Sequence, residues 1–284
     1  MANKESKTIL ITGCSSGIGL CCAKGLQTRG YRVFATARKT EDVAHLQQQG
    51  LESLQLDLAS SASIENAVDE VLKRTDGTLF ALFNNGAYAM PGAVEDLSRD
   101  MLRENFETNF FGTHELTCRI IPVMRKQGYG RIIQNSSLLG YVSLPYRGSY
   151  NSSKYALEGL TDAMRLELSD TNIFVSLIEP GPISSRFRAN AFAMYRKHID
   201  KEKSPHRAIY EGMESRLTKQ GPAQPFTLPP EAVLKKLIHA LESRKPKIRY
   251  PVTFPAYMFA FLRRYTTNRF LDNFLLSLSR RENR

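Results

Sequence analysis

The stretch from residue 7 to residue 19, Lys-Thr-Ile-Leu-Ile-Thr-Gly-Cys-Ser-Ser-Gly-Ile-Gly, joins a short apolar run to a glycine-rich turn. Lys7 to Thr12 predicts a buried first strand, which stops at Gly13. From Gly17 to Arg29 the apolar residues recur at helical spacing, and Gly30 ends that helix. A helix N-terminus offers unpaired N–H groups and a favourable dipole to a phosphate, and glycines let the backbone approach it closely. The alternative is a Gly/Ser-rich loop that binds no ligand. The position of the turn directly after the first strand disfavours this alternative.

Strands and helices alternate along most of the remaining chain. Alternation of this kind, with continuous apolar strands, indicates a parallel sheet with helices on both faces. The expected fold is therefore α/β: a single-domain, Rossmann-like, doubly wound parallel sheet with a C-terminal helical extension. The predicted strands after the first are 32–36, 53–56, 79–83, 131–135, 174–178 and 248–252, and the predicted helices are 41–49, 61–74, 99–127, 150–169 and 231–243.

Two segments stand apart from this alternation. Residues 188–230 are polar, hold five prolines and have no sustained period, which predicts a long substrate-side insertion without regular elements. We therefore expect a catalytic domain over 1–253, including that insertion, and an extension over 254–284. From Arg244 to the end, ten Lys/Arg face two acids, so this tail supplies +8 of the net charge of +11.

The extension contains two apolar stripes at helical spacing, with arginines among them. One interpretation is that both helices pack on the parent domain and cap the substrate pocket or a subunit interface. The other is that they lie on an anionic membrane surface as a peripheral contact. The stripes are Phe254, Tyr257, Met258, Phe261, Leu262 and Tyr265, then Phe270, Leu271, Phe274, Leu275 and Leu278.

The end of the second predicted strand bears on the choice of cofactor. A site for NAD usually carries Asp or Glu there, to bind the ribose hydroxyls. This chain has Arg38 and Lys39 instead, with no acid before Glu41. The planar guanidinium of Arg38 suits a 2′-phosphate, so the pattern predicts NADP(H), unless both cations only solvate a helix entrance.

Three residues suggest proton transfer. Tyr150 and Lys154 are four apart in a predicted helix and therefore share one face. Ser137 follows the fifth strand, at the sheet edge where ligand sites of open parallel sheets gather. An ammonium near a phenol favours the phenolate, so we expect Lys154 to lower the pKa of Tyr150 and Ser137 to hold a substrate oxygen.

Five motifs in order resemble those of the short-chain dehydrogenase/reductase family, over residues 7 to about 188. Within it, Ile178–Ile183 and Arg249–Val252 are similar to bacterial NADP-dependent aldehyde reductases and to the steroid and retinol dehydrogenase branch. The motifs are Thr12-Gly13-xxx-Gly17-x-Gly19, Asn84-Asn85, Ser137, Tyr150-xxx-Lys154 and Pro180-Gly181.

The resemblance implies a role for each matching residue. Asp57 would contact the adenine, Asn84 the adenosine ribose, and Asn109 would anchor a water of a proton relay, unless it is an incidental polar residue. Tyr150 would protonate the substrate oxygen, and Lys154 would also bind the nicotinamide ribose. Ile183 would meet the carboxamide through its backbone. The full expected cofactor set is Gly13, Ser15, Ser16, Gly17, Ile18, Gly19, Arg38, Lys39, Asp57, Leu58, Asn84, Asn85, Gly86, Tyr150, Lys154, Pro180, Gly181, Ile183 and Ser185.

One position departs from the family pattern. The family has Asn-Asn-Ala-Gly after strand four, whereas this chain has Asn84-Asn85-Gly86-Ala87. If the last position requires a positive φ, Ala87 would cost about 1 kcal/mol there.

These observations limit the function. The four cysteines have no CxxC spacing and the five histidines no metal-ligand spacing, so we expect reduced thiols and no metal site. The polar first residues predict a cytoplasmic protein, and no nucleic-acid module is present.

The expected activity is NADP(H)-dependent reduction of aldehydes or ketones with apolar substituents, or oxidation of the matching alcohols, by a homo-oligomer. The alternatives are a 3-oxoacyl-thioester reductase and a non-catalytic NADP(H)-binding sensor. The residues that favour an apolar pocket, unless they are ordinary packing, are Tyr141, Val142, Leu144, Phe187, Phe192 and Met194.

Overall fold

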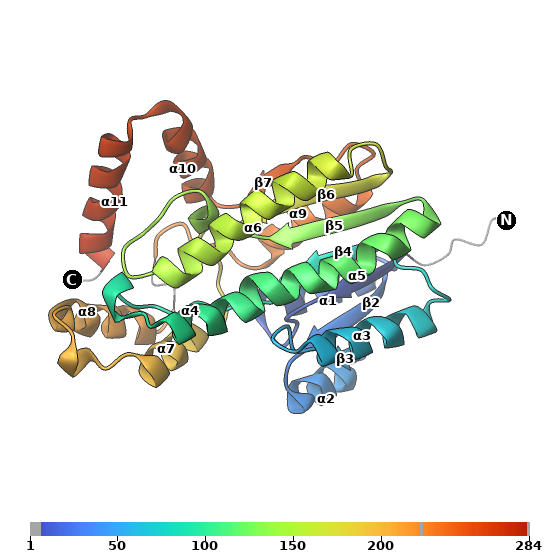
Figure 1. The fold of residues 1–284 in the computed structure, drawn as a ribbon, viewed down its shortest axis with the longest axis horizontal. Helices are drawn as coiled ribbons and strands as arrows, with labels where there is room; N and C mark the ends of the chain where they lie inside the picture. The colour runs from blue at the N-terminus through green and yellow to red at the C-terminus, as the bar shows by residue number, and fades with distance from the viewer. Residues whose placement is uncertain (1–6, 222–223, 283–284) are drawn as a thin grey trace.

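A seven-stranded parallel sheet forms the centre of the molecule (Figure 1). The structure is a computed structural model that describes residues 7–221 and 224–282. The expected α/β class and doubly wound sheet are confirmed. The strands are β1 (Thr8–Ile11), β2 (Arg32–Ala37), β3 (Glu52–Gln55), β4 (Ala81–Asn84), β5 (Gly130–Asn135), β6 (Ile173–Glu179) and β7 (Arg249–Pro251).

The strand order places the functional edge of the sheet. The order is β3-β2-β1-β4-β5-β6-β7, so the winding reverses between β1 and β4. These two strands pair directly, with Ile9 opposite Ala81 and Ile11 opposite Phe83. In open α/β sheets, ligands bind at the carboxyl ends of the strands beside such a reversal. The glycine turn leaves β1 at this point.

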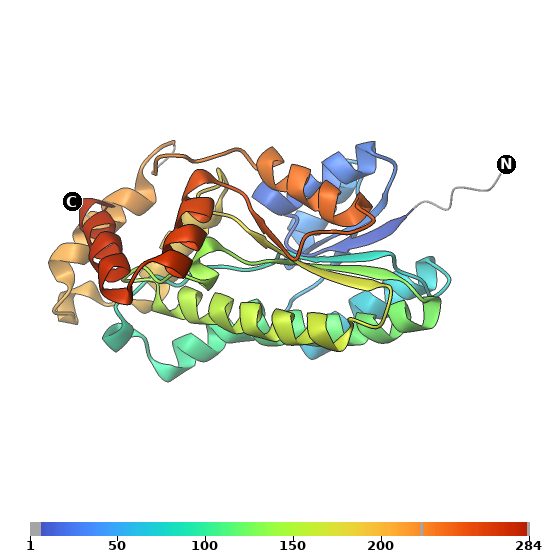
Figure 2. The same cartoon turned by 90° about the horizontal axis from the view of Figure 1, so that it is seen from above.

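Helices cover both faces of the sheet (Figure 2). One core lies between the sheet and α1, α2 and α9, and includes Leu26, Leu46 and Leu237. A second core lies between the opposite face and α3, α5 and α6, and includes Ile64 and Ile120. The helices are α1 (Gly17–Thr28), α2 (Thr40–Gln48), α3 (Ser61–Arg74), α4 (Arg99–Phe106), α5 (Gly112–Gln127), α6 (Gly148–Glu167), α7 (Phe187–His198), α8 (Arg207–Thr218), α9 (Glu231–Glu242), α10 (Phe254–Tyr265) and α11 (Asn268–Glu282).

The helix predicted over 99–127 contains a change of winding. α4 and α5 are joined by a π-helical turn over Glu107–Phe111, and the backbone stays right-handed helical through both junctions. Gly112 follows this turn directly and is tightly packed. A Cβ there would lie 1.7 Å from the carbonyl oxygen of Leu58. Such turns are frequent at functional sites. The turn contains Asn109, one of the expected site residues.

The segment 188–230 is not an irregular loop, and this expectation was wrong. It contains most of α7 and all of α8, which pack on each other around Tyr195, Tyr210 and Met213. The apolar residues of α8 do recur at helical spacing, at Tyr210, Met213 and Leu217. They are few, and Pro205 and the later prolines surround them, so the period is short and easily missed.

The extension forms a helical hairpin of α10 and α11, at the same end of the molecule as α7 and α8 in both views. Its inner side packs on the loop after β5, where Leu138 and Val142 meet Ala256 and Phe259. The Tyr141 hydroxyl also donates a 2.7 Å hydrogen bond to the carbonyl oxygen of Ala256. The hairpin therefore packs on the parent domain. No helix in the described part of the chain is long and apolar enough to span a membrane.

Candidate active site

The glycine turn after β1 has a backbone path that side chains would block. Gly13 has φ +70° and Gly17 has φ +56°, both in the left-handed region that favours glycine. A Cβ on Gly19 would lie 2.2 Å from the Gly13 carbonyl oxygen, and one on Gly13 would lie 2.8 Å from the Gly86 Cα. The turn is therefore pressed against the loop after β4, with no room for side chains at these positions.

The N-terminus of α1 opens from this turn into a cavity. Ser16 occupies the N-cap position without a side-chain capping bond, and the first turn of α1 has no acidic residue. Gly13, Ser15, Gly17 and Ile18 line the cavity with Ser16. Helix N–H groups and the positive end of the helix dipole thus face a space that a pyrophosphate fits. This geometry suits the cofactor expected from the sequence.

The loop after β4 is held to the turn by hydrogen bonds. The backbone N–H groups of Asn85 and Gly86 donate to the Thr12 hydroxyl, at 2.9 and 2.8 Å. The Asn85 side chain donates to the Thr12 carbonyl oxygen at 2.9 Å. The non-glycine residues with a positive φ in the described chain are Asp76, Tyr146 and Phe226, and Ala87 is not one of them. The exchanged Gly86-Ala87 order therefore causes no strain of that kind.

Asn84 and Asn85 have different surroundings. Asn85 lines the cavity and accepts a 2.8 Å hydrogen bond from the Asn135 side chain. Asn84 is buried and donates to the Thr117 hydroxyl of α5 at 2.8 Å. Asn84 is not among the residues that line the cavity, and the ribose contact that the resemblance implies stays a prediction.

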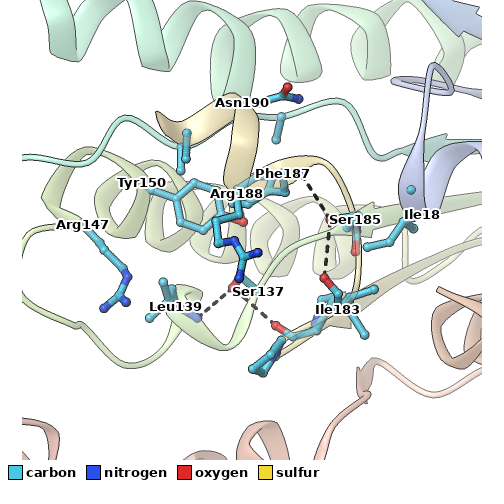
Figure 3. A pocket seen from close by; sticks show the side chains of 18 of the residues that line it. Ile18, Ser137, Leu139, Arg147, Tyr150, Ile183, Ser185, Phe187, Arg188 and Asn190 are labelled. Carbon is cyan, nitrogen blue, oxygen red and sulfur yellow. Dashed lines mark hydrogen bonds between the residues drawn. The ribbon is translucent and has the colours of Figure 1, made fainter. Parts of the chain in front are cut away.

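Tyr150, Lys154 and Ser137 converge on the same cavity, whose volume is about 410 Å³. Tyr150 and Lys154 lie one turn apart on α6, and Ser137 follows β5. In Figure 3, Tyr150 lies between Ile18 and Ser185 on the side of the glycine turn and Arg147 on the other. A carbonyl group beside Tyr150 would thus have the turn at one end and Arg147 at the other.

Burial determines the protonation of these groups. It raises the pKa of Tyr150 to about 12, and a hydrogen bond with Ser137 only partly opposes it. Burial also lowers the pKa of Lys154 to about 8, although the negative charge of Glu158 acts to raise it. The Lys154 ammonium lies 5.7 Å from the centre of the Tyr150 ring and donates a 2.8 Å hydrogen bond to the carbonyl oxygen of Asn135. The expected lowering of the Tyr150 pKa is therefore wrong for this structure, because desolvation raises the pKa by more than the Ser137 hydrogen bond lowers it.

Asn109 lies behind the cavity rather than in its lining. Its side chain accepts a hydrogen bond from the Tyr88 N–H at 3.0 Å and donates one to the Tyr88 carbonyl oxygen at 2.8 Å. It also donates to the Ser153 hydroxyl of α6 at 3.2 Å. The side chain thus ties the loop after β4 to α6. The water-anchoring role stays a prediction.

The residues expected to bind the adenosine end lie at the same sheet edge. Arg38 and Lys39 are exposed directly after β2, and Asp57 follows the neighbouring strand β3. Asp57 accepts a 3.0 Å hydrogen bond from the Ala59 N–H. Leu58 is buried against α5 at Gly112. The Arg38 side chain makes no hydrogen bond or ion pair with the described residues, which leaves its guanidinium available to a ligand; its carbonyl oxygen accepts a 3.0 Å hydrogen bond from the Gln55 side chain.

The segment after β6 lies beside the glycine turn, because a Cβ on Gly17 would lie 2.7 Å from the Ser185 Cβ. Gly181 is required by packing, because a Cβ there would lie 2.1 Å from the Thr253 hydroxyl. Ile183 pairs with Leu228 in an isolated parallel bridge, which fixes its backbone. Ser185 accepts a 3.3 Å hydrogen bond from the Phe187 N–H at the start of α7. Together with Pro180, the segment lines the cavity next to the glycine turn.

Of the residues expected to make the pocket apolar, only two line the cavity. These are Leu144 and Phe187, whose ring packs edge-on against the Tyr150 ring at 5.4 Å. The other four pack in clusters beneath α7 or α10. Tyr141 and Val142 lie under α10, Phe192 lies between α7 and α8, and Met194 packs near Met90.

Some lining residues were missed by the sequence analysis. Asn135, which supplies the carbonyl acceptor for Lys154, ends β5 two residues before Ser137, and that position was a usable signal. Arg147, Arg188 and Arg216 also line the cavity. Only Arg147, three residues before Tyr150, had a sequence position that pointed to the site.

Comparison with known proteins identifies the family. The model of the short chain dehydrogenase family matches residues 7–196. The chain belongs to this family. It is an oxidoreductase of the short-chain dehydrogenase type, as the ordered motifs predict.

Individual relatives span nearly the whole chain. The chain is 42% identical to the uncharacterised oxidoreductase YbbO of Escherichia coli, over 95% of this chain and 94% of that protein. It is 31% identical to the NADPH-dependent 3-dehydrocapnine reductase of Ornithobacterium rhinotracheale, over 93% and 94%. It is also 31% identical to human 17-beta-hydroxysteroid dehydrogenase type 1, over 86% and 77%, which confirms the resemblance to the steroid branch. A short-chain dehydrogenase structure from Streptomyces avermitilis superposes with a TM-score of 0.77, at 27% identity, over 98% of this chain and 96% of that one.

Proposed function

We propose that this short-chain dehydrogenase uses NADP(H) to reduce aldehydes or ketones with apolar substituents, or to oxidise the matching alcohols. The observation that carries the proposal is one cavity lined by Ser137, Tyr150 and Lys154, with the glycine turn at one end. When bound, NADPH supplies the hydride. Gly13–Gly19 would hold its pyrophosphate at the N-terminus of α1, and Lys154 its nicotinamide ribose.

The side chains provide the proton chemistry of this reaction. Tyr150 would donate its proton to the substrate oxygen, and Ser137 would hold that oxygen by a hydrogen bond. The Lys154 ammonium, fixed on the Asn135 carbonyl oxygen at 2.8 Å, would stabilise the phenolate left on Tyr150. The Phe187 ring, whose centre lies 5.4 Å from that of the Tyr150 ring, limits the positions that the Tyr150 ring can take.

Two observations support NADP(H) over NAD(H). The exposed Arg38 and Lys39 stand where a ribose 2′-phosphate would be recognised, and no acid ends β2. The NADPH-dependent reductase of Ornithobacterium, similar over nearly its full length, points the same way.

The experiment is a substrate screen that follows NADPH and NADH oxidation. Aldehydes, ketones, steroids and a 3-oxoacyl thioester would be compared at equal concentration. We expect turnover of aldehydes or ketones, with kcat/KM at least about tenfold higher for NADPH than for NADH. Preference for the thioester would assign the alternative reductase activity. NADPH binding without turnover of any carbonyl compound would contradict an enzymatic role.

A further inference from the structure

Lys154 is a buried cation in a cavity wall without acids. Its side chain is 3% exposed, and the described residues that line the cavity include no Asp or Glu. Burial by itself favours the neutral form of a lysine, because the ammonium loses its hydration. The ammonium donates a 2.8 Å hydrogen bond to the carbonyl oxygen of Asn135, which is neutral. Its charge therefore needs support from behind the wall.

Glu158 lies one helical turn after Lys154 on α6. Residues four apart share one helix face, with their Cβ atoms about 5–6 Å apart. Glu158 is 6% exposed and does not line the cavity. It packs under the short turn that follows Ser137, since a Cβ on Gly140 of that turn would lie 2.9 Å from the Glu158 Cγ. The carboxylate is thus fixed beside Lys154 and outside the cavity.

Arg249 holds the Glu158 carboxylate without cancelling its charge. Its guanidinium contacts Glu158, Glu179 and Asp162, so one positive charge is shared by three carboxylates. Negative charge is therefore left for a second cation, and Lys154 is placed to be that cation. Burial lowers the pKa of Lys154 to about 8, and the charge of Glu158 opposes this effect. The ionisable groups that face the pair in the described chain are Tyr141, Tyr150, Asp162, Glu179 and Arg249.

We propose that Glu158 is a positioning residue that keeps the Lys154 ammonium charged beside Tyr150. It acts through Lys154, because it does not line the cavity itself. With a neutral lysine, the phenolate left on Tyr150 after proton donation would lose the positive charge that stabilises it. The inference rests on the proposed function and deepens it, because it assigns a task to a buried acid that the proton chemistry does not otherwise use.

The pH profile of carbonyl reduction tests this role with an uncharged variant. Wild-type kcat should fall as Lys154 loses its proton above about pH 8. Glu158→Gln keeps the size of the side chain but removes its charge, so this fall should begin about one pH unit or more lower. Glu158→Asp keeps the charge, and its fall should begin within about half a unit of the wild-type pH.

Asp162→Asn is the matched control, because it removes another carboxylate that contacts Arg249. Asp162 lies about 12 Å from Lys154 along the axis of α6, about twice the separation of Glu158 from Lys154. Asp162 is also partly exposed, so its loss should move the fall in kcat less than half as far as the loss of Glu158. Equal shifts in the two variants would assign the effect to the contacts of Arg249 and overturn the inference.

Urea unfolding gives a second readout that needs no turnover. The pKa of Lys154 is about 8 in the folded protein and about 10.4 in an unfolded chain. Between these values the unfolded chain binds more protons, so stability rises with pH. Glu158→Gln should lower the folded pKa further, so its reduction of the folding equilibrium constant should be about threefold larger at pH 7.5 than at pH 9.5. This difference should almost disappear in a Lys154→Met background, where Glu158 has no lysine to act on.

The two readouts separate this inference from the proposed function. If Glu158→Gln leaves the pH profile unchanged, or if its effect on stability has the same size at both pH values, the inference is overturned even though carbonyl compounds are reduced. If no carbonyl compound reacts, while unfolding shows the pH-dependent coupling of Glu158 to Lys154, only the proposed function is contradicted.

Discussion

The hydroxyl of Tyr150 is protonated at neutral pH, because burial raises its pKa to about 12. The Lys154 ammonium, with a pKa of about 8, is still mostly charged under the same conditions. The pair therefore consists of a proton donor and a neighbouring cation that would stabilise the donor's conjugate base. A proton donor with a neighbouring cation is what the proposed reduction of a carbonyl group requires of this pair.

Tyr150→Phe removes only the ionisable hydroxyl and keeps the ring that packs against Phe187. If Tyr150 is the general acid, kcat should fall by about 100-fold or more. NADPH affinity should change far less, because the ring and its neighbours stay in place. Steady-state kinetics and NADPH titration measure both quantities. Near-normal turnover would show that another group supplies the proton.

Arg38→Ala tests the cofactor preference at a single side chain. The exposed guanidinium makes no bond within the described chain, so its loss should not disturb the fold. The expected loss is one charge-assisted hydrogen bond to a 2′-phosphate, which lowers NADPH affinity about tenfold to a hundredfold. NADH affinity should be almost unchanged. Arg125→Ala, exposed near the end of α5, is the matched control. A parallel loss for both cofactors would exclude 2′-phosphate recognition by Arg38.

At the scale of elements, the parts with a strong local signal were predictable. The turn between β1 and α1 is dictated by glycines at 13, 17 and 19, whose backbone positions exclude a Cβ or favour a positive φ. The alternating strands and helices follow from their apolar periods. Tyr150, Lys154 and Ser137 were predictable because helical spacing and strand ends place side chains without knowledge of the packing.

The elements that were missed depend on packing between distant segments. The π-turn over Glu107–Phe111 has no period of its own, and it brings Asn109 to the backbone of Tyr88. α7 and α8 bury few large residues, so their helical signal is weak. The burial that sets the pKa of Tyr150 also depends on the completed fold. Sequence spacing could place Lys154 near Tyr150, but it could not show how strongly burial raises the Tyr150 pKa.

An ion cluster joins three elements beside the site. Arg249 of β7 contacts Glu158 of α6, Glu179 of β6 at 2.8 Å and Asp162 of α6 at 2.5 Å. Glu179 is 2% exposed, and burial raises its pKa to about 7, with the charge of Glu158 adding to the effect. The single positive charge of Arg249 thus faces three carboxylates, two of which are buried. A proton on Glu179 removes one of the negative charges and therefore stabilises the folded protein.

The pH dependence of stability should report this proton. Below about pH 4.5 Glu179 is protonated in the folded and in the unfolded protein. Between about pH 4.5 and pH 7 only the folded protein keeps the proton, so the stability of the fold falls as the pH rises. Glu179→Gln is neutral throughout, so the fall in unfolding free energy from pH 5 to 7.5 should shrink by up to about 3 kcal/mol. Urea unfolding at both pH values measures it, with the exposed Glu167→Gln as control. The same pH dependence in Glu179→Gln and wild type would contradict the assignment.

At the scale of the whole molecule, the α10–α11 hairpin has two different sides. Its inner side packs on the loop that follows β5, around Phe259 and Leu271. The outer face of α10 is aromatic, and Phe261 and Tyr265 are 61% and 66% exposed. α10 contains no acidic residue. The two interpretations of the tail are therefore compatible, because the inner side packs on the domain and leaves an outer face for a further surface.

The charge around this outer face favours an anionic membrane surface as its occupant. Arg263, Arg264 and Arg269 are exposed on and beside α10. Basic residues near an anionic bilayer contribute about 1 kcal/mol each, and interfacial aromatic side chains add apolar burial. The membrane would then bring lipophilic substrates to the end of the molecule that contains the hairpin and α7. We propose this contact as a second feature of the function, in addition to the reaction itself.

Cosedimentation with phosphatidylserine-containing liposomes tests this contact. Deleting 254–284 would uncover Leu138 and Val142, so outer-face substitutions make a better test than a truncation. Wild-type protein should pellet at low salt and remain in the supernatant at about 0.5 M salt, where the Debye length is only a few ångströms. Tyr257→Ser, Phe261→Ser and Tyr265→Ser combined should abolish pelleting and leave Tm nearly unchanged, because these side chains are already exposed.

The controls separate a membrane from a second copy of the chain. Tyr129→Ser with Leu166→Ser replaces equally exposed apolar residues elsewhere and should leave pelleting intact. Liposomes without anionic lipid should bind little, because the arginines then lose their partners. If the wild type stays in the supernatant at low salt while the triple variant reduces its oligomeric state, the outer face of α10 contacts another subunit. The membrane interpretation would then be wrong, and the lipophilic substrate would have to reach the cavity from solution.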